Sequence, residues 1–277
     1  MIFIQILDDK CVSVACVTES WFDTKNGVFS KTLKDAGYKL HHAFREKRGG
    51  GVAIVYKNNM TVKDGGASCD RYLSFEYAFV TITLQTKQRM VLVCIYRNQE
   101  ITFSIFQDEL SSFIEQTVFK GDSTVIVGDF NVWVDDEEDQ DAKKLLTLMS
   151  TYGLNQLVHE PTHRGGHTLD HIYINEFQIQ ITHEVINDTL GLTTDHFPIV
   201  LGIPSTSVQA NTRTIHYRKL QDVDMHAFRN DLQQSYEKFD EESNFEQSFA
   251  QYRETTSSVV NNHAPVLTKT IKTLQAP

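Results

Sequence analysis

The chain has 277 residues, of which 40% are apolar and 22% are charged, so it can bury a sizeable core and is not expected to be disordered. No apolar run approaches the roughly 18 residues of a membrane-spanning helix, so we expect no membrane partner. The net charge of −10 excludes a nucleic-acid partner held by a generally basic surface, although it is compatible with a local basic rim. The four cysteines lack metal-binding spacing, and no signal peptide is evident, which predicts an intracellular, reducing location.

Short β-branched or apolar runs bounded by turn residues are typical of strands. They occur at residues 11–18, 51–56, 77–84, 90–96, 123–128, 168–174, 179–185 and 197–202. Apolar residues recur at steps of three and four in Phe103–Phe119 and in Asp141–Tyr152, which predicts two amphipathic helices. Because only a few helices interrupt the strands, the pattern predicts an α+β sandwich rather than a repeated βαβ unit.

A domain boundary is predicted at the polar segment PSTSVQAN, residues 204–211, which has no hydrophobic periodicity. We therefore expect a domain at 1–203, a linker at 204–211 and a mainly helical region at 212–277. Two helical patterns lie in that last region, at 222–239 and 245–261. The final segment, from His263 onward, is expected to be irregular.

The segment VIVGDFN, residues 125–131, predicts a buried strand that ends in Gly128 and presents Asp129 and Asn131 at its tip. Because side chains alternate along a strand, these two lie on one face. A carboxylate and an amide side by side could activate a water molecule and hold a phosphate oxygen. An ordinary turn, in which Asp and Asn are common, explains the same residues equally well.

Three further residues are candidates for the same chemistry. His196 follows Asp195 and precedes the strand at 197–202, where an imidazole could act as base or acid or stabilise phosphate charge. Glu19 follows an apolar strand, and a carboxylate there suits a hard cation such as Mg²⁺. Asp170 lies inside an apolar strand, so its charge needs a partner such as an imidazole. Taken singly, an ordinary histidine and a solvated glutamate are the commoner interpretations.

Three other patterns do not predict ligand sites. Histidines recur every four residues in 159–171, but a proline and two glycines between them argue against a helical metal face. Arg48 and the three glycines after it lack the pattern of a phosphate loop, so we expect a glycine turn that enters a strand. The acidic run at 135–141 lacks Ca²⁺-loop spacing, and we expect a solvated loop whose acids favour the N-terminus of the next helix.

The order of the motifs along the chain is more informative than any single motif. The motifs are TESW at 18–21, KRGGGVAIVYK at 47–57, VCIYR at 93–97, VGDFNVWVD at 127–135, PTHRGGHTLDHIYI at 161–174 and TDHFPIV at 194–200. Over about residues 8–203 this order resembles the endonuclease/exonuclease/phosphatase superfamily, and most closely the apurinic-type endonuclease domain of LINE-type retrotransposons. Segments 218–232 and 262–271 also resemble the connector that precedes the reverse transcriptase in LINE polyproteins.

The resemblance implies a four-layer sandwich, in which two packed mixed β-sheets are flanked by helices. It implies a Mg²⁺-dependent endonuclease, with Mn²⁺ as an alternative ion, that nicks DNA and has access to the nucleus. Asp129 would then activate water or serve the leaving group, and Asp170 would orient His196. The implied catalytic residues are Tyr96, Asp129, Asn131, Asp170 and His196; the implied metal ligands are Glu19 and Asp195; and the implied substrate contacts are Thr168, Arg97 and Arg48. A local basic rim for DNA is expected from Arg45, Lys47, Arg48, Arg97 and Arg164.

The resemblance is incomplete at one point. The family's domain begins with a strand that ends in an asparagine, and nothing upstream of Glu19 matches it, so we expect that first strand to be missing. Two alternatives to a DNA endonuclease therefore stay open. One is a catalytically impaired or non-enzymatic fragment derived from a retrotransposon, and the other is a phosphoesterase that acts on another phosphodiester. The chemistry of the site is shared by these substrates and does not separate them.

Overall fold

The computed structural model of the chain divides into two compact units. The residues that it describes are 2–21, 27–43, 49–117, 121–175, 181–203, 210–237 and 245–274. The sandwich unit comprises Met1–Thr212 together with Lys272–Pro277, and the helical unit comprises Arg213–Ile271. The two units are described separately.

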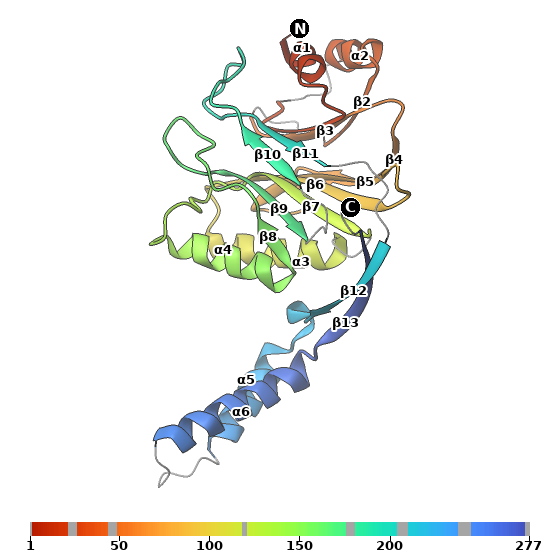
Figure 1. Cartoon of the computed structure of the whole chain (residues 1–277). Coiled ribbons are helices and arrows are strands. Elements are labelled where there is room, and N and C mark those ends of the chain that lie inside the picture. Colours follow the sequence, from red (N-terminus) through yellow and green to blue (C-terminus); the bar gives the residue numbers. More distant parts are fainter. Residues whose placement is uncertain are drawn as a thin grey trace. The chain divides into compact units, whose positions relative to one another are not determined.

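A six-stranded sheet forms the centre of the sandwich unit (Figure 1). In spatial order its strands are β4 (Thr61–Ser68), β5 (Phe75–Thr83), β6 (Arg89–Arg97), β7 (Ser123–Asp129), β9 (Asp170–Asn175) and β8 (Leu154–Gln156). β6 and β7 run parallel, and the other neighbouring pairs are antiparallel, so the sheet is mixed. Four of these strands, β5, β6, β7 and β9, lie where the sequence predicts them, because each is a buried run of β-branched and apolar residues.

Two smaller antiparallel sheets complete the strands of this unit. The three-stranded sheet has the order β1 (Val14–Thr18), β3 (Val52–Lys57) and β2 (Tyr38–His42). The two-stranded sheet pairs β10 (Thr182–Val185) with β11 (Ile199–Gly202). The predicted strands at 11–18, 51–56 and 197–202 are confirmed in shorter or shifted form, whereas the predicted strand at 179–185 begins outside the described residues.

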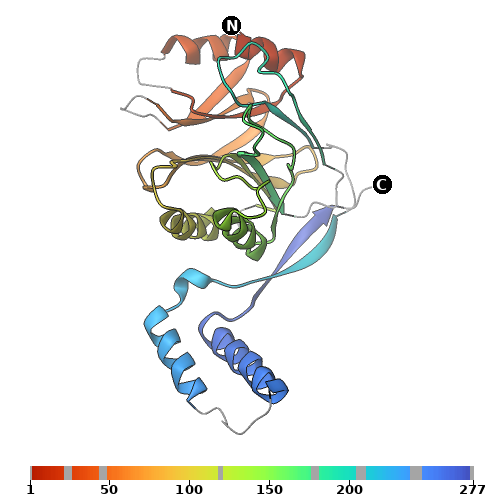
Figure 2. The same cartoon turned by 90° about the vertical axis from the view of Figure 1, so that its left-hand side faces the viewer.

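Helices cover both outer faces of the sandwich. Figures 1 and 2 show α3 (Phe103–Thr117) and α4 (Gln140–Thr151) beneath the six-stranded sheet, with α1 (Ile2–Asp9) and α2 (Gly27–Asp35) at the opposite end of the unit. Two rings of α3 pack edge-on against a ring of β5: Phe106 and Phe113 lie 5.9 and 5.7 Å from Phe75, between centroids. Edge-to-face contacts of this kind are the favoured geometry for buried aromatic rings. The predicted helices are confirmed, and the order of layers is the expected four-layer α+β sandwich.

Alternation along the central strands divides the core into layers. Val93 and Ile95 of β6 pack toward α3 and α4, whereas Leu92 and Cys94 pack toward the three-stranded sheet. A third cluster joins α1 and α2 to the far side of the three-stranded sheet, through side chains such as Leu33. A strand buried on both faces is therefore apolar at every position, which explains the continuous run in β6.

The helical unit contains strands as well as helices. Its elements are the larger part of β12 (Ala210–Tyr217), a short 3₁₀ helix (Leu220–Asp222), α5 (Met225–Tyr236), α6 (Phe245–His263) and the larger part of β13 (Leu267–Leu274), because the boundaries of the unit cross both strands. β12 and β13 pair in a two-stranded sheet. The expected irregular end is therefore wrong: β13 contains three Thr and one Ile, and these β-branched residues favour a strand. The predicted linker at 204–211 also overlaps the start of β12, and its first six residues lie outside the described ranges.

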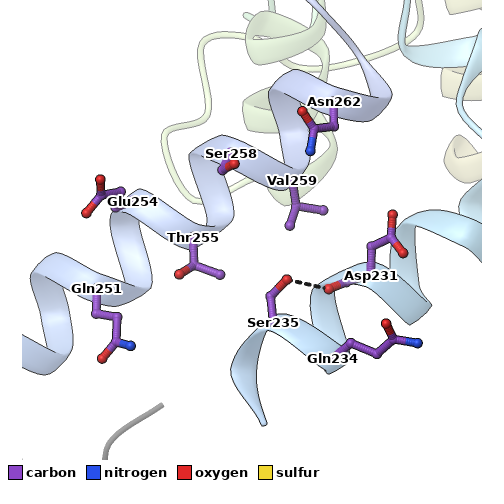
Figure 3. A pocket seen from close by; sticks show the side chains of 9 residues that line it. All are labelled: Asp231, Gln234, Ser235, Gln251, Glu254, Thr255, Ser258, Val259 and Asn262. Atoms are coloured by element: carbon purple, nitrogen blue, oxygen red, sulfur yellow. Dashed lines mark hydrogen bonds between the residues drawn. The ribbon is translucent and has the colours of Figure 1, made fainter. Parts of the chain in front are cut away.

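A polar groove of about 490 Å³ lies between α5 and α6 (Figure 3). Its lining includes Ser235, whose hydroxyl donates to the backbone oxygen of Asp231 at 2.6 Å. The facing helix contributes side chains such as Thr255 and Gln251. None of the residues that line it is a predicted site residue. No helix in the described ranges is both long and apolar enough to span a membrane.

Candidate active site

Three polar side chains lie next to one another at the ends of neighbouring strands. The parallel register of β6 and β7 places Tyr96 beside Asp129. The antiparallel register of β7 and β9 places Asp129 opposite Asp170. Residues that pair across a sheet point to the same face, so these three side chains form a row, here called the polar row. Tyr96 also packs against the core between the two larger sheets, which shows that the row faces that side.

The sharp end of β7 depends on a glycine. Gly128 has a φ of +144°, which is a backbone conformation that other residues rarely adopt. A Cβ atom there would overlap the backbone oxygen of Ile95 on β6. Glycine therefore allows β6 and β7 to stay paired up to Asp129, and this is the reason that the GDFN motif can present its aspartate at the strand end.

One end of the polar row is a histidine–aspartate pair. His196 Nδ1 lies 2.8 Å from Asp170 Oδ2. The Asp170 N–H donates to the Thr162 hydroxyl, and the His196 N–H donates to the Thr194 hydroxyl, so both backbones are held. The hydrogen bond that His196 donates to the Asp170 carboxylate raises the pKa of His196 to about 9. The imidazole is therefore charged at neutral pH, which suits stabilisation of negative charge on a phosphate.

Asp129 lies at the centre of the row and is only 4% exposed. Burial, followed by the negative charge of Asp170, raises the pKa of Asp129 to about 7. Asn131 holds this carboxylate, because its backbone N–H donates to Asp129 Oδ1 at 3.0 Å. The Asn131 side-chain amide donates in turn to the backbone oxygen of Arg97 at 3.0 Å. A carboxylate with a pKa near 7 can accept a proton from water at neutral pH, so Asp129 is a candidate general base.

Glu19 joins the other end of the row. The Tyr96 hydroxyl donates to Glu19 Oε1 at 2.6 Å. Burial, and then the Glu19 carboxylate, raise the pKa of Tyr96, so its hydroxyl keeps its proton. The residues after Glu19 bond to the glycine turn, since the Ser20 N–H donates to the Gly51 backbone oxygen at 3.1 Å. Gly51 has a φ of +93°, and a Cβ there would lie 2.7 Å from Ser20 Oγ, which explains the glycines before β3.

Two predicted substrate contacts are buried in the structure. Arg97 is 7% exposed, and its Nη1 donates to the backbone oxygen of Asn131 at 2.8 Å. Thr168 is 0% exposed, and its hydroxyl donates to the backbone oxygen of Glu160 at 2.9 Å. Both buried side chains therefore bond to the backbone of loops near the site and are not exposed to a substrate. Arg48, the third predicted contact, lies outside the described residues, as do Arg45 and Lys47 of the expected rim.

Asp195 is held by a histidine to which the sequence had given no role. His163 Nε2 lies 3.0 Å from Asp195 Oδ2, and the backbone N–H of Gly165 donates to His163 Nδ1 at 2.9 Å. Because Nδ1 accepts this hydrogen bond, the proton of the neutral ring is on Nε2 and is donated to Asp195. That contact lowers the pKa of Asp195. His163 lies in the PTHRGGHTLD motif, which marks it as a residue near the site. The spacing along the chain does not predict its contact with Asp195.

Asp195 also belongs to a candidate metal group. Ligand atoms of His163, Asp195 and His196 lie within 4.8 Å of one another, and Glu19 is not part of this group. An ion bound to His163 Nε2 would require the proton to move to Nδ1, which would break the hydrogen bond from Gly165. The hydrogen bonds therefore favour His163 as a donor to Asp195 over His163 as a metal ligand.

The comparisons with known proteins identify the family. The sequence model of the Endonuclease/Exonuclease/phosphatase family matches residues 6–196. This match covers more than half of the chain and includes the polar row, and the chain therefore belongs to that family. The enzymes of this family are hydrolases that generally depend on a divalent metal. A search among curated protein sequences finds no match.

Solved structures with similar folds include nucleic-acid enzymes. The 3′ phosphatase NExo from Neisseria, solved with a product DNA hairpin, has a TM-score of 0.52 and 17% identity, over 72% of this chain and 92% of that chain. An AP endonuclease from Archaeoglobus fulgidus has a TM-score of 0.52 and 15% identity, over 72% of this chain and 91% of that chain. A family protein from Leptotrichia buccalis has a TM-score of 0.51 and 17% identity, over 73% and 91%. At these identities the likeness establishes the fold.

Proposed function

We propose that this protein is a Mg²⁺-dependent endonuclease that nicks one strand of DNA, in the manner of the endonuclease domain of LINE retrotransposons. The observation that carries the proposal is the continuous line of contacts from Glu19 through Tyr96 and Asp129 to Asp170 and His196. This line gathers a candidate base, a charged imidazole and a phenol at one strand edge. A function on nuclear DNA is part of the same proposal.

Hydrolysis of a phosphodiester by this arrangement divides the work among the residues. Asp129 takes a proton from the attacking water, because its pKa is near 7. His196, charged through its bond with Asp170, stabilises the negative charge that develops on the phosphate oxygens. Tyr96 offers a protonated hydroxyl beside them, and Asn131 keeps Asp129 in position. The bond that breaks joins phosphorus to the 3′ oxygen, and the departing oxygen takes up a proton from solvent water, so a nick leaves a 3′ hydroxyl and a 5′ phosphate.

A divalent cation fits the donors at this edge. The carboxylates of Glu19 and Asp170 each contribute to the raised pKa of Asp129, so the edge carries more negative charge than its histidine balances. Carboxylate oxygens together with phosphate oxygens are the ligands that Mg²⁺ prefers. Glu19 would hold the ion, with Asp195 as the proposed second carboxylate. The ion would neutralise charge on the phosphate.

Nicking of supercoiled plasmid tests the proposal. The full chain with Mg²⁺ should convert supercoiled to open-circular DNA, and EDTA should stop the conversion. The new ends should be extended by a DNA polymerase, since extension requires a 3′ hydroxyl. Asp129→Ala and His196→Ala should lose activity, whereas Glu254→Gln on an exposed face of α6 should keep it. If wild type matches buffer alone, the endonuclease proposal fails, and both alternatives, a non-enzymatic fragment and a phosphoesterase that acts on another substrate, stay open.

A parallel assay separates the remaining alternative. The same preparations are given a phosphodiester that is not a nucleic acid, such as a phosphoinositide or a sphingolipid. Turnover of that substrate without nicking of plasmid would show a phosphoesterase of different substrate class. Loss of both activities in Asp129→Ala would still locate the chemistry at the polar row.

A further inference from the structure

An exposed tryptophan lies beside the candidate active site. Trp133 follows Asn131 by two residues, so their Cα atoms are at most about 7 Å apart. The Trp133 side chain is 46% exposed, although a large aromatic ring gains most from burial. One face of its indole is covered by the imidazole of His167, at 4.0 Å between ring centroids and an angle of 2° between planes. The stack therefore presents a flat aromatic surface next to the reacting groups.

Hydrogen bonds hold this stack in one orientation. His167 Nδ1 lies 3.0 Å from Asp135 Oδ2, and the Thr168 N–H donates to Asp135 Oδ1 at 2.7 Å. The backbone oxygen of His167 accepts hydrogen bonds from the N–H groups of Thr162 and His163, at 3.0 and 3.2 Å. Asp135 thus joins the loop after β7 to the loop before β9. A rigid aromatic surface loses little conformational entropy when a ligand binds it.

The charge around the stack restricts what can bind there. Six acidic residues lie in the run Asp135–Asp141, directly after Trp133 and Val134. These acids repel a phosphate backbone, whereas the π-face of a nucleobase carries no net charge and stacks on aromatic rings. A base can reach such a surface once it has left the duplex stack.

We propose that Trp133, held by His167 and Asp135, is a stacking platform for an unpaired nucleobase of the substrate, next to the phosphate that is cut. The inference rests on the proposed function in DNA and adds a subsite that reads the base and not the phosphate. The platform favours substrate in which one nucleotide beside the cut is unstacked or single-stranded.

Tryptophan fluorescence measures the platform directly. The chain has two tryptophans, so the variant Trp21→Phe leaves Trp133 as the only one. This protein is titrated in EDTA, which prevents cleavage, with a short oligothymidylate and with an abasic oligonucleotide of the same length. We expect the base-bearing strand to quench the fluorescence and to bind more tightly than the abasic strand.

Substitution then measures the contribution of the ring. Loss of one base–aromatic stack weakens binding by about 5- to 150-fold, which is the change expected for Trp133→Ala. Trp133→Phe should keep most of the affinity, and the loss in Trp133→Ala should be the same at low and high salt, since stacking releases no counterions. Tyr252→Ala is the matched control, because that ring is 51% exposed and is stacked on Tyr236 at 5.6 Å, yet belongs to the helical unit. The Tyr252→Ala variant should bind the oligonucleotide with the same affinity as the wild type.

Three results would overturn the platform. They are unchanged affinity in Trp133→Ala, equal affinity for the base-bearing and abasic strands, and no binding of either strand by the wild type. The binding assay requires no catalysis, so the two proposals fail separately. Quenching by oligothymidylate without any nicking of plasmid would contradict the endonuclease proposal and support the base-binding subsite. Nicking of plasmid, together with unchanged oligonucleotide affinity in Trp133→Ala, would contradict the base-binding subsite and support the endonuclease proposal.

Discussion

The sandwich unit and the helical unit each contain a histidine bonded to an aspartate at 2.8 Å. In the sandwich unit the pair is His196 with Asp170, and in the helical unit it is His263 with Asp231. The first pair lies at strand ends beside the buried carboxylate of Asp129, whereas the second joins α6 to α5. A close contact between imidazole and carboxylate therefore does not define a site. The neighbouring acids and the backbone that fixes them do.

The two units also differ in how much they bury. The sandwich unit has three clusters of buried apolar side chains, one between each pair of layers. In the described part of the helical unit, the buried apolar residues are Val259 and Ala264. Because burial of apolar surface is the main favourable contribution to folding, the sandwich unit should be much the more sensitive to loss of side-chain volume.

The largest expected effect is on catalysis. Asp170→Asn keeps the size of the side chain but removes the charge that holds the His196 imidazolium. We expect the initial rate of plasmid nicking to fall at least about 100-fold, as for loss of a group that stabilises transition-state charge. The counterpart Asp231→Asn should nick like the wild type. Similar losses of activity in both variants would contradict the conclusion that only the Asp170–His196 pair contributes to catalysis.

The next effect is on stability. Phe106 is fully buried among the rings of β5 and α3, so Phe106→Ala should lower the free energy of unfolding by about 3–5 kcal/mol. Val259→Ala in the helical unit should cost about 1 kcal/mol. Urea unfolding followed by tryptophan fluorescence measures the first change, because both tryptophans lie in the sandwich unit, and circular dichroism measures the second. A larger loss for Val259→Ala would contradict the difference in cores.

A smaller effect concerns pH. Burial lowers the pKa of His171 to about 4, while its backbone hydrogen bonds to Val132 and Thr168 oppose the shift. The unfolded chain binds this proton below about pH 6.5, and the folded chain binds it only near pH 4. Stability should therefore fall as the pH decreases from 6.5 to 4, by up to about 1.4 kcal/mol per pH unit from this group. Urea midpoints across this range should depend less steeply on pH in His171→Gln than in the wild type.

The smallest effect concerns His163, the histidine that holds Asp195. His163→Ala removes the donor that holds Asp195, and we expect about 10-fold slower nicking with little change in stability. Gly165→Ala should act in the same direction, because its Cβ would lie 2.9 Å from His163 Nδ1. Gly27→Ala, with open space around its Cβ, is the matched control. Full activity in both His163→Ala and Gly165→Ala would remove His163 from the site.

Some elements could be predicted from local pattern, and others could not. β6 and α3 were predictable because their apolar residues follow the strand and helix periods. β4 was missed because it is an edge strand with two glycines and a register shift between Asp64 and Gly66, so its exposed residues lack an apolar pattern. β2, β8, β12 and β13 were missed as well. Strands of this kind are stabilised by their partners and carry a weak signal of their own.

The candidate site divides in the same way. The sequence by itself determined which chemical groups are available: the GDFN carboxylate and amide, the TDH imidazole, and Glu19 after its strand. Only the tertiary structure decided which of them meet, since Glu19 and Tyr96 are 77 positions apart, and Asp170 and His196 are 26 apart. It also buried Arg97 and turned His163 toward Asp195. Hydrogen bonds, charge and desolvation act through space and not along the chain, so strand pairing had to bring these side chains together before any of them acquired a role.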